Sequence, residues 1–300
     1  MNALEPTTAT HGGVTTGGAL LAVDGVKVAY KVKGLGRKKA EILHGVSLDL
    51  RPGETHGLVG ESGSGKSTLG RAILGLAPVS EGSITFQGED TTHASKRRRR
   101  DLAQDIQAVF QDPYSSLSPA LTIGDTLAEP LRALGVSRSE ASQRVNELLD
   151  VVQLPSDALS RYPREFSGGQ RQRVAIARAL ALSPKLIVCD EPVSALDLTT
   201  QARVLELLLQ VQERTNVALL FISHDLSVVR VMSHRVSVMY RGDIVETGEA
   251  AQVTSSPTHP YTQRLLLAAP VADPQRQAER RHARAATMTS CLDEKRRTHA

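Results

Sequence analysis

The sequence of 300 residues predicts an α/β fold with a mainly parallel sheet, to which a small antiparallel sheet and a helical insertion are attached. Beyond residue 185, apolar runs of strand length alternate with a helix-like segment, in the order Leu186–Cys189, Thr200–Thr215 and Val217–Ser223. This order is typical of βαβ units and therefore of a parallel sheet. Nearer the N-terminus, a strand-like stretch, a glycine-rich loop and a helix-like stretch follow one another between residues 56 and 76.

Residues 20–88 predict the antiparallel sheet. Apolar and polar residues alternate from Leu20 to Val28 and again from Ile42 to Leu50, where the turn residues Arg51-Pro-Gly-Glu54 follow. Ser83–Gly88 predicts another strand that ends in a turn. Short strands separated by turn residues indicate an antiparallel arrangement.

Residues 112–180 predict the helical insertion. Pro113, Pro119 and Pro130 are expected to break this segment into short helices. Within Ser139–Val152, apolar residues recur on one helical face.

The two ends of the chain predict disorder. Residues 1–18 are rich in Thr, Gly and Ala, and residues 271–300 hold seven Lys and Arg against four Asp and Glu, without periodicity. Since this basic tail carries most of the net charge of +4, the rest of the chain is close to neutral. The overall charge is therefore weak support for nucleic-acid binding.

The composition and the N-terminal residues predict a protein of the reducing cytoplasm. No apolar run approaches the roughly 18 residues that cross a bilayer, and the N-terminus resembles no secretory signal. Cys189 falls in a predicted buried strand and Cys291 in the tail, so we expect neither a disulfide nor a metal site from them.

The glycine-rich loop Gly60-Glu-Ser-Gly-Ser-Gly-Lys-Ser-Thr68 fits the pattern G-x-x-x-x-G-K-[ST]. His56–Val59 precedes it as a strand, and Leu69, Ile73 and Leu76 follow on one face of a predicted helix. Backbone N–H groups in such a loop point at phosphate oxygens, and the helix directs the positive end of its dipole there. The alternative is an ordinary Gly/Ser turn. The candidate nucleotide-binding residues are Gly60, Ser62, Gly63, Ser64, Gly65, Lys66, Ser67 and Thr68.

Two carboxylates leave the apolar run Leu186–Cys189 at Asp190 and Glu191, where parallel strands place their ligand sites. Asp190 suits the coordination shell of a Mg²⁺ ion that the hydroxyl of Ser67 also binds. Glu191 suits a general base that orients water against a γ-phosphate. The alternative is that Glu191 only pairs with a nearby Lys or Arg.

The run Lys96–Arg100 has two interpretations, a nucleic-acid patch or the solvated face of a helix. Leu102, Ile106 and Val109 follow at near-helical spacing, which favours a helix through this segment. Aromatic residues are 3% of the chain and Trp is missing, so stacking platforms for single strands are not expected.

Phe166-Ser-Gly-Gly-Gln-Arg171 lies between the phosphate loop and the acidic pair, and it resembles the signature sequence of the ATP-binding cassette (ABC) ATPases. Ser194-Ala-Leu-Asp197 and His224 complete the motifs in the family's order, so the resemblance covers residues 20–270. It implies a P-loop NTPase (RecA-like) core, an antiparallel β-subdomain and an α-helical signature subdomain. The expected domains are residues 19–250, with the helical subdomain at 112–180, and a C-terminal extension at 251–270.

The resemblance also implies roles for single residues. Two cassettes would face each other head to tail, each offering its signature residues Ser167, Gly168, Gly169 and Gln170 to the ATP bound by its partner. Phe166 replaces the usual Leu, which is also apolar.

Four more residues match family positions. Gln111 would contact Mg²⁺ and water, and His224 would hold the γ-phosphate, although a lone His is otherwise a surface or core residue. Asp197 would lie at the dimer seam. Tyr30 would stack on adenine, the alternative being a residue that packs on a strand face.

A narrower resemblance rests on Phe110–Pro119, Glu191–Asp197 and Thr258–Leu266, which are similar to the oligopeptide/dipeptide and nickel importers. The block His259-Pro-Tyr261 belongs to the C-terminal extension of that subfamily, and we interpret it as a packing or partner-docking element.

The resemblance thus implies the ATPase of a binding-protein-dependent importer at the cytoplasmic face of a membrane, with ATP and Mg²⁺ as cofactors. Its expected partners are two permease chains, a second cassette that is identical or homologous, and an extracytoplasmic solute-binding protein. Oligopeptides or dipeptides are the expected solutes, and nickel is the alternative. A soluble ABC ATPase acting on nucleic acid and an exporter cassette are the other candidates that we consider.

Overall fold

The computed structural model describes residues 18–31, 39–112 and 117–268. Nearly all of the predicted N-terminal arm and the whole of the predicted basic tail, including Cys291, lie outside the described residues.

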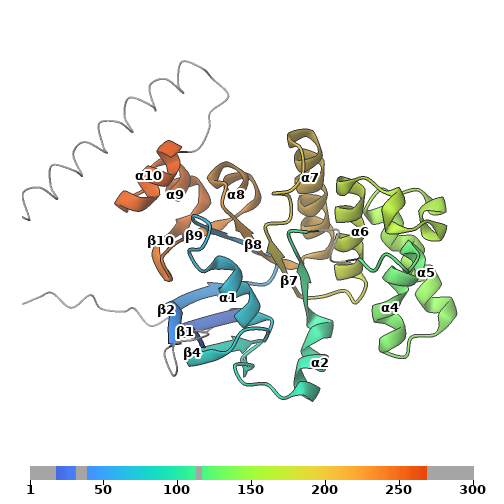
Figure 1. The fold of residues 1–300 in the computed structure, drawn as a ribbon, viewed down its shortest axis with the longest axis horizontal. Coiled ribbons are helices and arrows are strands. Elements are labelled where there is room, and N and C mark those ends of the chain that lie inside the picture. Colours follow the sequence, from blue (N-terminus) through green and yellow to red (C-terminus); the bar gives the residue numbers. More distant parts are fainter. Residues whose placement is uncertain (1–17, 32–38, 113–116, 269–300) are drawn as a thin grey trace, which may run out of the picture.

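A six-stranded sheet forms the centre of the molecule (Figure 1), with the strand order β10-β9-β3-β8-β7-β6. Five of these strands run parallel to their neighbours, and β10 pairs antiparallel with β9. The mainly parallel sheet expected from the sequence is therefore present. Its strands are β3 (Thr55–Val59), β6 (Ile106–Val109), β7 (Leu186–Asp190), β8 (Ala218–Ser223), β9 (Arg235–Tyr240) and β10 (Asp243–Glu249).

A four-stranded antiparallel sheet with the order β2-β1-β4-β5 lies beside the first. The strands β1 and β2 are long rather than short, because register shifts let them bend without ending. Its strands are β1 (Leu21–Lys31), β2 (Lys39–Leu50), β4 (Val79–Phe86) and β5 (Glu89–Asp90).

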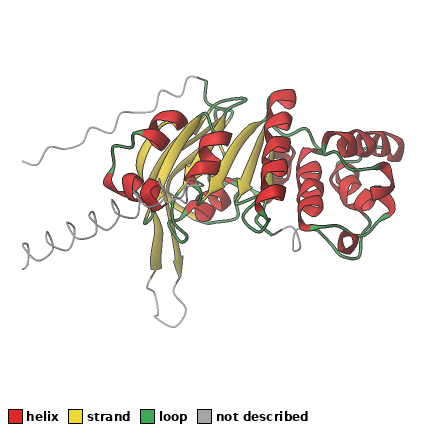
Figure 2. Ribbon diagram, turned by 90° about the horizontal axis from the view of Figure 1, so that it is seen from above, coloured by secondary structure: helices red, strands yellow, loops and turns green. Residues whose placement is uncertain are grey.

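Helices of the segment 123–180 form a group at one end of the molecule, next to the β6 edge of the larger sheet (Figures 1 and 2). These are α4 (Ile123–Ala133), α5 (Arg138–Val151) and α6 (Gly168–Leu180), with the short 3-10 helices η1 (Ser156–Ser160) and η2 (Pro163–Glu165). The remaining helices are α1 (Lys66–Ile73), α2 (Lys96–Asp105), α7 (Leu198–Thr215), α8 (Leu226–Met232), α9 (Ala250–Ser255) and α10 (Pro260–Ala268).

The central strands are buried on both faces, so neighbouring residues of one strand belong to different cores. Leu58, Val188 and Ile222 pack in the core shared with the antiparallel sheet. Val59, Cys189 and Phe221 pack in the core on the opposite face, which also includes the helical group. This double burial explains why these strands read as continuous apolar runs in the sequence.

The expectation that the helix after Lys96 continues through Val109 is wrong. Helix α2 ends at Asp105, and Ile106–Val109 forms strand β6, whose Ile106 pairs with Leu186 of β7. Pairing at the sheet edge overrides the local helical spacing, and the β-branched Ile106 and Val109 suit a strand. The predicted solvated helical face is confirmed for Lys96–Arg100, which is exposed throughout.

Two predicted helix boundaries also differ. Helix α1 ends at Ile73, because Gly75 adopts a left-handed conformation and the N–H of Leu76 donates to the carbonyl of Arg71. Leu76 is consequently 66% exposed instead of packing on the helix face. Pro130 lies inside α4 rather than ending it. The buried residues on the same helix keep the segment helical despite the missing hydrogen bond.

In the described part of the chain, no helix is both long enough and apolar enough to cross a membrane.

The fold predicts that the thiol of Cys189 is inert in the native state. Cys189 is fully buried in β7, and burial, with the charge of Asp190 adding to it, raises its pKa to about 12. In a Cys291→Ser variant, a disulfide reagent at pH 8 should therefore react only after denaturant is added. Rapid release of the coloured thiolate without denaturant would contradict the burial of β7.

Candidate functional site

The phosphate loop connects β3 to α1 and is in close contact with the β9–β10 hairpin. A Cβ atom added to Gly60 would lie 2.1 Å from the carbonyl oxygen of Met239, so only glycine fits at the start of the loop. Further along, the N–H of Gly242 donates to the carbonyl of Ser64 at 2.8 Å. Gly65 is the N-cap of α1, and without a side chain it leaves the first N–H groups of the helix available to an anion.

Lys66 curls back over the loop. Its Nζ donates to the carbonyl oxygens of Gly60 at 2.7 Å and Glu61 at 2.9 Å, and the residue is buried. Burial lowers the pKa of Lys66, while the carboxylates of Glu191, Asp190 and Glu61 act in the opposite direction. Within the described residues the ammonium is thus hydrogen-bonded only to backbone oxygens, a weak set of partners for a buried cation.

The two segments that sequence spacing could not connect meet at Ser67 and Asp190. The Oγ of Ser67 donates to Oδ1 of Asp190 at 2.8 Å, across 123 positions of the sequence. Burial raises the pKa of Asp190; the hydrogen bond from Ser67 opposes this effect, and the charge of Glu191 adds to it. The loop and the acidic strand end therefore form one site.

Glu191 adopts a left-handed backbone conformation with φ of 49°, which is unfavourable for a residue with a side chain. The N–H of Glu191 donates to the carbonyl of Ile222 at 3.0 Å, and the hydroxyl of Ser194 donates to the carbonyl of Glu191 at 3.1 Å. Oε2 of Glu191 lies 3.2 Å from Nδ1 of His224, the residue that follows β8. Among the described residues Glu191 thus pairs with a histidine, and the alternative, an ion pair with Lys or Arg, is not found.

The residues at this edge fit a Mg²⁺–nucleotide. Ser67 and Asp190 place two oxygen atoms within a hydrogen bond of each other, and hard oxygen ligands are what Mg²⁺ requires. In the described residues no cluster of three or more His, Cys, Asp or Glu could hold a metal ion.

Gln111 lies at the same edge of the sheet but is not joined to the ion site. In the parallel register Val109 of β6 pairs with Cys189 of β7, so Gln111 and Glu191 leave their strands at the same level. In the described segments Gln111 makes no hydrogen bond to Ser67 or Asp190.

The signature residues form the N-terminus of α6. Ser167 caps the helix, its Oγ accepting from the N–H of Gln170, and the Gln170 side chain accepts from the N–H of Ser167. No hydrogen bond or ion pair in the described residues connects Ser167, Gly168 or Gly169 to the phosphate loop of the same chain. These signature residues therefore make no such bond to their own loop within the described part of the chain.

Asp197 and Tyr30 are both exposed at the surface. Asp197 is the N-cap of α7, where the hydrogen bonds from Thr200 lower its pKa. Tyr30 lies near the end of β1 and is 39% exposed, so it does not fill a core position on the strand face.

Sequence reasoning missed Tyr261, whose hydroxyl accepts a hydrogen bond from the N–H of Glu61 in the loop at 3.0 Å. No local pattern relates α10 to the loop, and the only signal was the block His259-Pro-Tyr261 itself.

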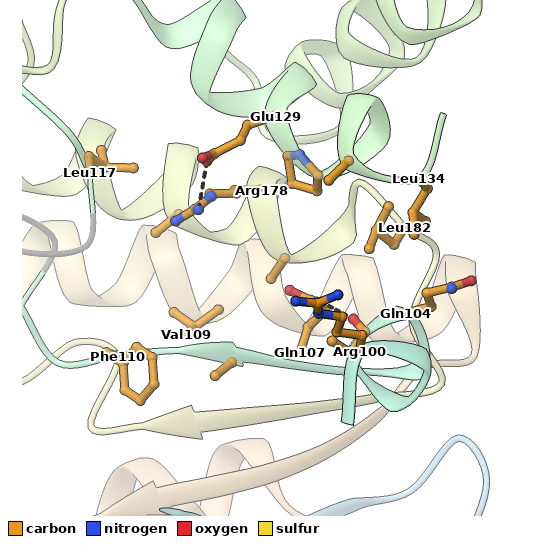
Figure 3. A pocket seen from close by; sticks show the side chains of 16 residues that line it. Arg100, Gln104, Gln107, Val109, Phe110, Leu117, Glu129, Leu134, Arg178 and Leu182 are labelled. Atoms are coloured by element: carbon orange, nitrogen blue, oxygen red, sulfur yellow. Dashed lines mark hydrogen bonds and ion pairs between the residues drawn. The ribbon is translucent and has the colours of Figure 1, made fainter. Parts of the chain in front are cut away.

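A groove of about 880 Å³ separates the helical group from α2 and β6. Figure 3 shows Glu129 and Arg178 on its upper wall, joined by an ion pair of 2.9 Å, and Val109 and Phe110 on its lower wall. Its other lining residues are mostly apolar or uncharged and include Leu117, Pro130, Ala133, Leu134, Ala175, Ala179 and Leu182. Phe110, which lines the groove, directly precedes Gln111 in the sequence.

Comparison with known sequences matches two regions of the chain to transporter models. Residues 43–194 match the model described as ABC transporter, and residues 245–300 match the model described as Oligopeptide/dipeptide transporter, C-terminal region. The glutathione import ATP-binding protein GsiA of Salmonella paratyphi A is 49% identical over 273 residues, covering 89% of this chain and 44% of GsiA. The oligopeptide transport ATP-binding protein OppD of Mycobacterium bovis is 51% identical over 255 residues, covering 84% of this chain and 42% of OppD. The chain spans less than half the length of these relatives.

Solved structures have the same architecture. A dimeric post-hydrolysis state of the ATP-binding cassette MJ0796, bound to ADP and Pi, is 30% identical with a TM-score of 0.69 and covers 77% of this chain and 98% of that one. The cbiO1 protein of Clostridium perfringens is 26% identical with a TM-score of 0.71, covering 80% of this chain and 92% of that one. The fold expected from the sequence is confirmed.

Proposed function

Because the chain belongs to the ABC transporter family, we propose that it is the ATP-hydrolysing subunit of an importer that takes up oligopeptides or dipeptides. The observation that carries this proposal is the hydrogen bond of 2.8 Å between Ser67 and Asp190, which unites the phosphate loop with the acidic strand end. ATP and Mg²⁺ are the proposed cofactors, with Ser67, Asp190 and Gln111 as the residues that would hold the ion. When bound, the ion supplies positive charge against the developing charge on the phosphoryl oxygens.

The chain's own residues would position the reactants. The N–H groups at the start of α1 and the ammonium of Lys66 bind the phosphate tail, since both direct positive charge into the loop. Glu191 orients the attacking water and accepts its proton. His224, which lies 3.2 Å from that carboxylate, is the candidate to hold the γ-phosphate.

A second cassette would complete each site. The signature residues Ser167–Gln170 offer a helix N-terminus and, among the described residues, form no hydrogen bond or ion pair with the loop of their own chain. The solved relative MJ0796 is dimeric. We therefore propose a head-to-tail pair in which the signature and Asp197 of one chain face the nucleotide of the other. Tyr30, which is exposed, would stack on the adenine.

The groove between α2, β6 and the helical group would receive a short helix from a permease chain. It is largely apolar, it has a volume of about 880 Å³, and it includes Phe110, the residue before Gln111. Movement of a helix seated there would reach the nucleotide site through the segment after Phe110. The subunit would thus act at the cytoplasmic face of a membrane with two permease chains and an extracytoplasmic binding protein, and without nucleic acid.

The proposed solute class follows from the relatives. GsiA is named for glutathione import and OppD for oligopeptide transport, and the match at residues 245–300 is to an oligopeptide/dipeptide transporter region. Reconstitution with the permease, comparing peptide-loaded with nickel-loaded binding protein, would identify the solute. ATPase stimulation by the nickel-loaded protein alone would overturn the peptide assignment.

We expect Glu191→Gln to bind ATP normally and to hydrolyse it about 10²–10⁴ times more slowly, because the amide cannot accept the proton of the attacking water. Single-turnover phosphate release would measure the effect. Glu213→Gln, an exposed substitution on α7, is the matched control and should behave as the wild type. Unchanged turnover in the Glu191 variant would disprove its role as the base.

We expect Lys66→Ala to weaken ATP binding itself, because the substitution removes the ammonium from the loop. Equilibrium titration with a fluorescent ATP analogue would measure the loss, and Lys96→Ala, at an exposed position on α2, is the control. The proposed phosphate-binding role fails if the Lys66 variant, shown to be folded by circular dichroism, retains the wild-type dissociation constant.

Leu134→Glu should abolish co-purification with the permease while leaving basal ATP hydrolysis intact. Leu134 lines the groove and is 45% exposed, so a charge there would oppose an apolar helix without disturbing the core. Val231→Glu introduces the same charge at an exposed apolar position on α8, outside the groove. Equal permease recovery with both variants would show that the groove is not the docking site.

A further inference from the structure

The C-terminal segment 256–268 packs against the start of the phosphate loop. Helix α10 carries Tyr261, which is only 3% exposed, and its hydroxyl accepts a hydrogen bond of 3.0 Å from the N–H of Glu61. The two residues are separated by 200 positions. A side chain from the end of the described chain therefore contributes directly to the backbone geometry of the loop.

Tyr261 and Lys66 hold the same peptide unit from opposite sides. The N–H of Glu61 and the carbonyl of Gly60 belong to one planar peptide. Its N–H donates to the Tyr261 hydroxyl, and its carbonyl accepts from Nζ of Lys66 at 2.7 Å. The orientation of this peptide plane fixes the carbonyl that holds the lysine ammonium, so the tyrosine acts on the lysine through the peptide.

The position of Tyr261 is itself fixed by β9 and β10. Its ring packs on that of Tyr240, with centroids 4.2 Å apart and an interplanar angle of 35°. The carboxylate of Glu246 accepts hydrogen bonds from the N–H of Thr258 at 2.7 Å and of His259 at 3.1 Å. Burial alone would raise the pKa of Glu246, but these bonds, together with one from the hydroxyl of Thr258, lower it. Glu246 therefore remains charged at neutral pH and anchors the segment that leads into α10.

We propose that Tyr261 is a positioning residue of the nucleotide site, through which the C-terminal segment sets the affinity for ATP. The proposal rests on the proposed function, because it concerns the same phosphate loop. Without the hydroxyl, the Gly60–Glu61 peptide loses one of its two restraints and populates other orientations. Only the fraction of molecules with the competent loop binds nucleotide tightly, so the apparent dissociation constant rises as that fraction falls.

The test compares the full-length chain with Tyr261→Phe and Tyr240→Phe. Both substitutions remove one hydroxyl and keep the aromatic pair, but in the described residues only that of Tyr261 bonds to the loop. With a fluorescent ATP analogue, Tyr261→Phe should raise the dissociation constant about fivefold, the usual effect of one hydrogen bond. KM for ATP should rise by a similar factor while kcat stays within about twofold. Tyr240→Phe should match the wild type.

A second variant keeps the proposal testable if Tyr261→Phe proves unstable. Glu246→Gln weakens the anchor of the segment and should raise the same dissociation constant by about two- to fivefold. Because Glu246 acts through Tyr261, the effects of the two substitutions should not add. The double variant Tyr261→Phe/Glu246→Gln should bind ATP no more weakly than the single variant with the larger loss. Independent, additive losses would contradict the proposed order of action.

The outcomes separate the two proposals. If the wild type binds ATP and Lys66→Ala does not, but Tyr261→Phe binds as the wild type does, the proposal for Tyr261 is overturned and the proposed function stands. A loss of kcat at unchanged KM would also overturn it, since a looser loop affects binding first. If the wild type itself fails to bind ATP, the proposed function is what fails.

Discussion

The register of the three central parallel strands is the constraint on which the site depends. Val59 of β3 pairs with Ser223 of β8, and Asp190 of β7 pairs with Ile222, so these strands end within one residue of each other. The chain then continues as Gly60, Glu191 and His224, which therefore emerge at one edge. Burial of the strands on both faces holds this register, because a shift by one residue would exchange the side chains of the two cores.

The same edge carries an electrostatic imbalance that suits a charged ligand. Lys66 and Asp190 are both buried. Burial lowers the pKa of Lys66 and raises the pKa of Asp190, so in both cases it favours the uncharged form. Glu191 adds a strained backbone at φ of 49°. These unfavourable features coincide with the residues that the proposed chemistry requires. A phosphate tail with its cation would bring the charges that the buried groups lack, so the cost to the fold of keeping them there would be recovered on binding.

Local patterns predicted the parts of this protein that local interactions determine. The glycine-rich loop and the acidic strand end were recognisable, since both depend on residue types at fixed spacing beside apolar runs. The strand at Ile106–Val109 was not, because its conformation is decided by pairing with β7, far along the chain. The end of α1 was predicted too late, because the apolar spacing continues to Leu76 whereas the left-handed Gly75 ends the helix before it. The block His259-Pro-Tyr261 marked Tyr261 as a packing or docking residue, but no local pattern indicated that its partner is Glu61.

That last contact gives the loop a support outside its own motif. On one side the backbone of Met239 lies so close that Gly60 has no room for a Cβ atom, and Gly242 bonds to Ser64. On the other, Tyr261 holds the first peptide of the loop. The β9–β10 hairpin contributes to both supports. Tyr240 and Glu246 fix the position of Tyr261, and the backbone of Met239 leaves no room for a side chain at Gly60. Through Tyr261, any displacement of α10 relative to this hairpin acts on the peptide that restrains Lys66. Under our proposal, the C-terminal segment thereby changes nucleotide affinity without altering any residue that touches phosphate.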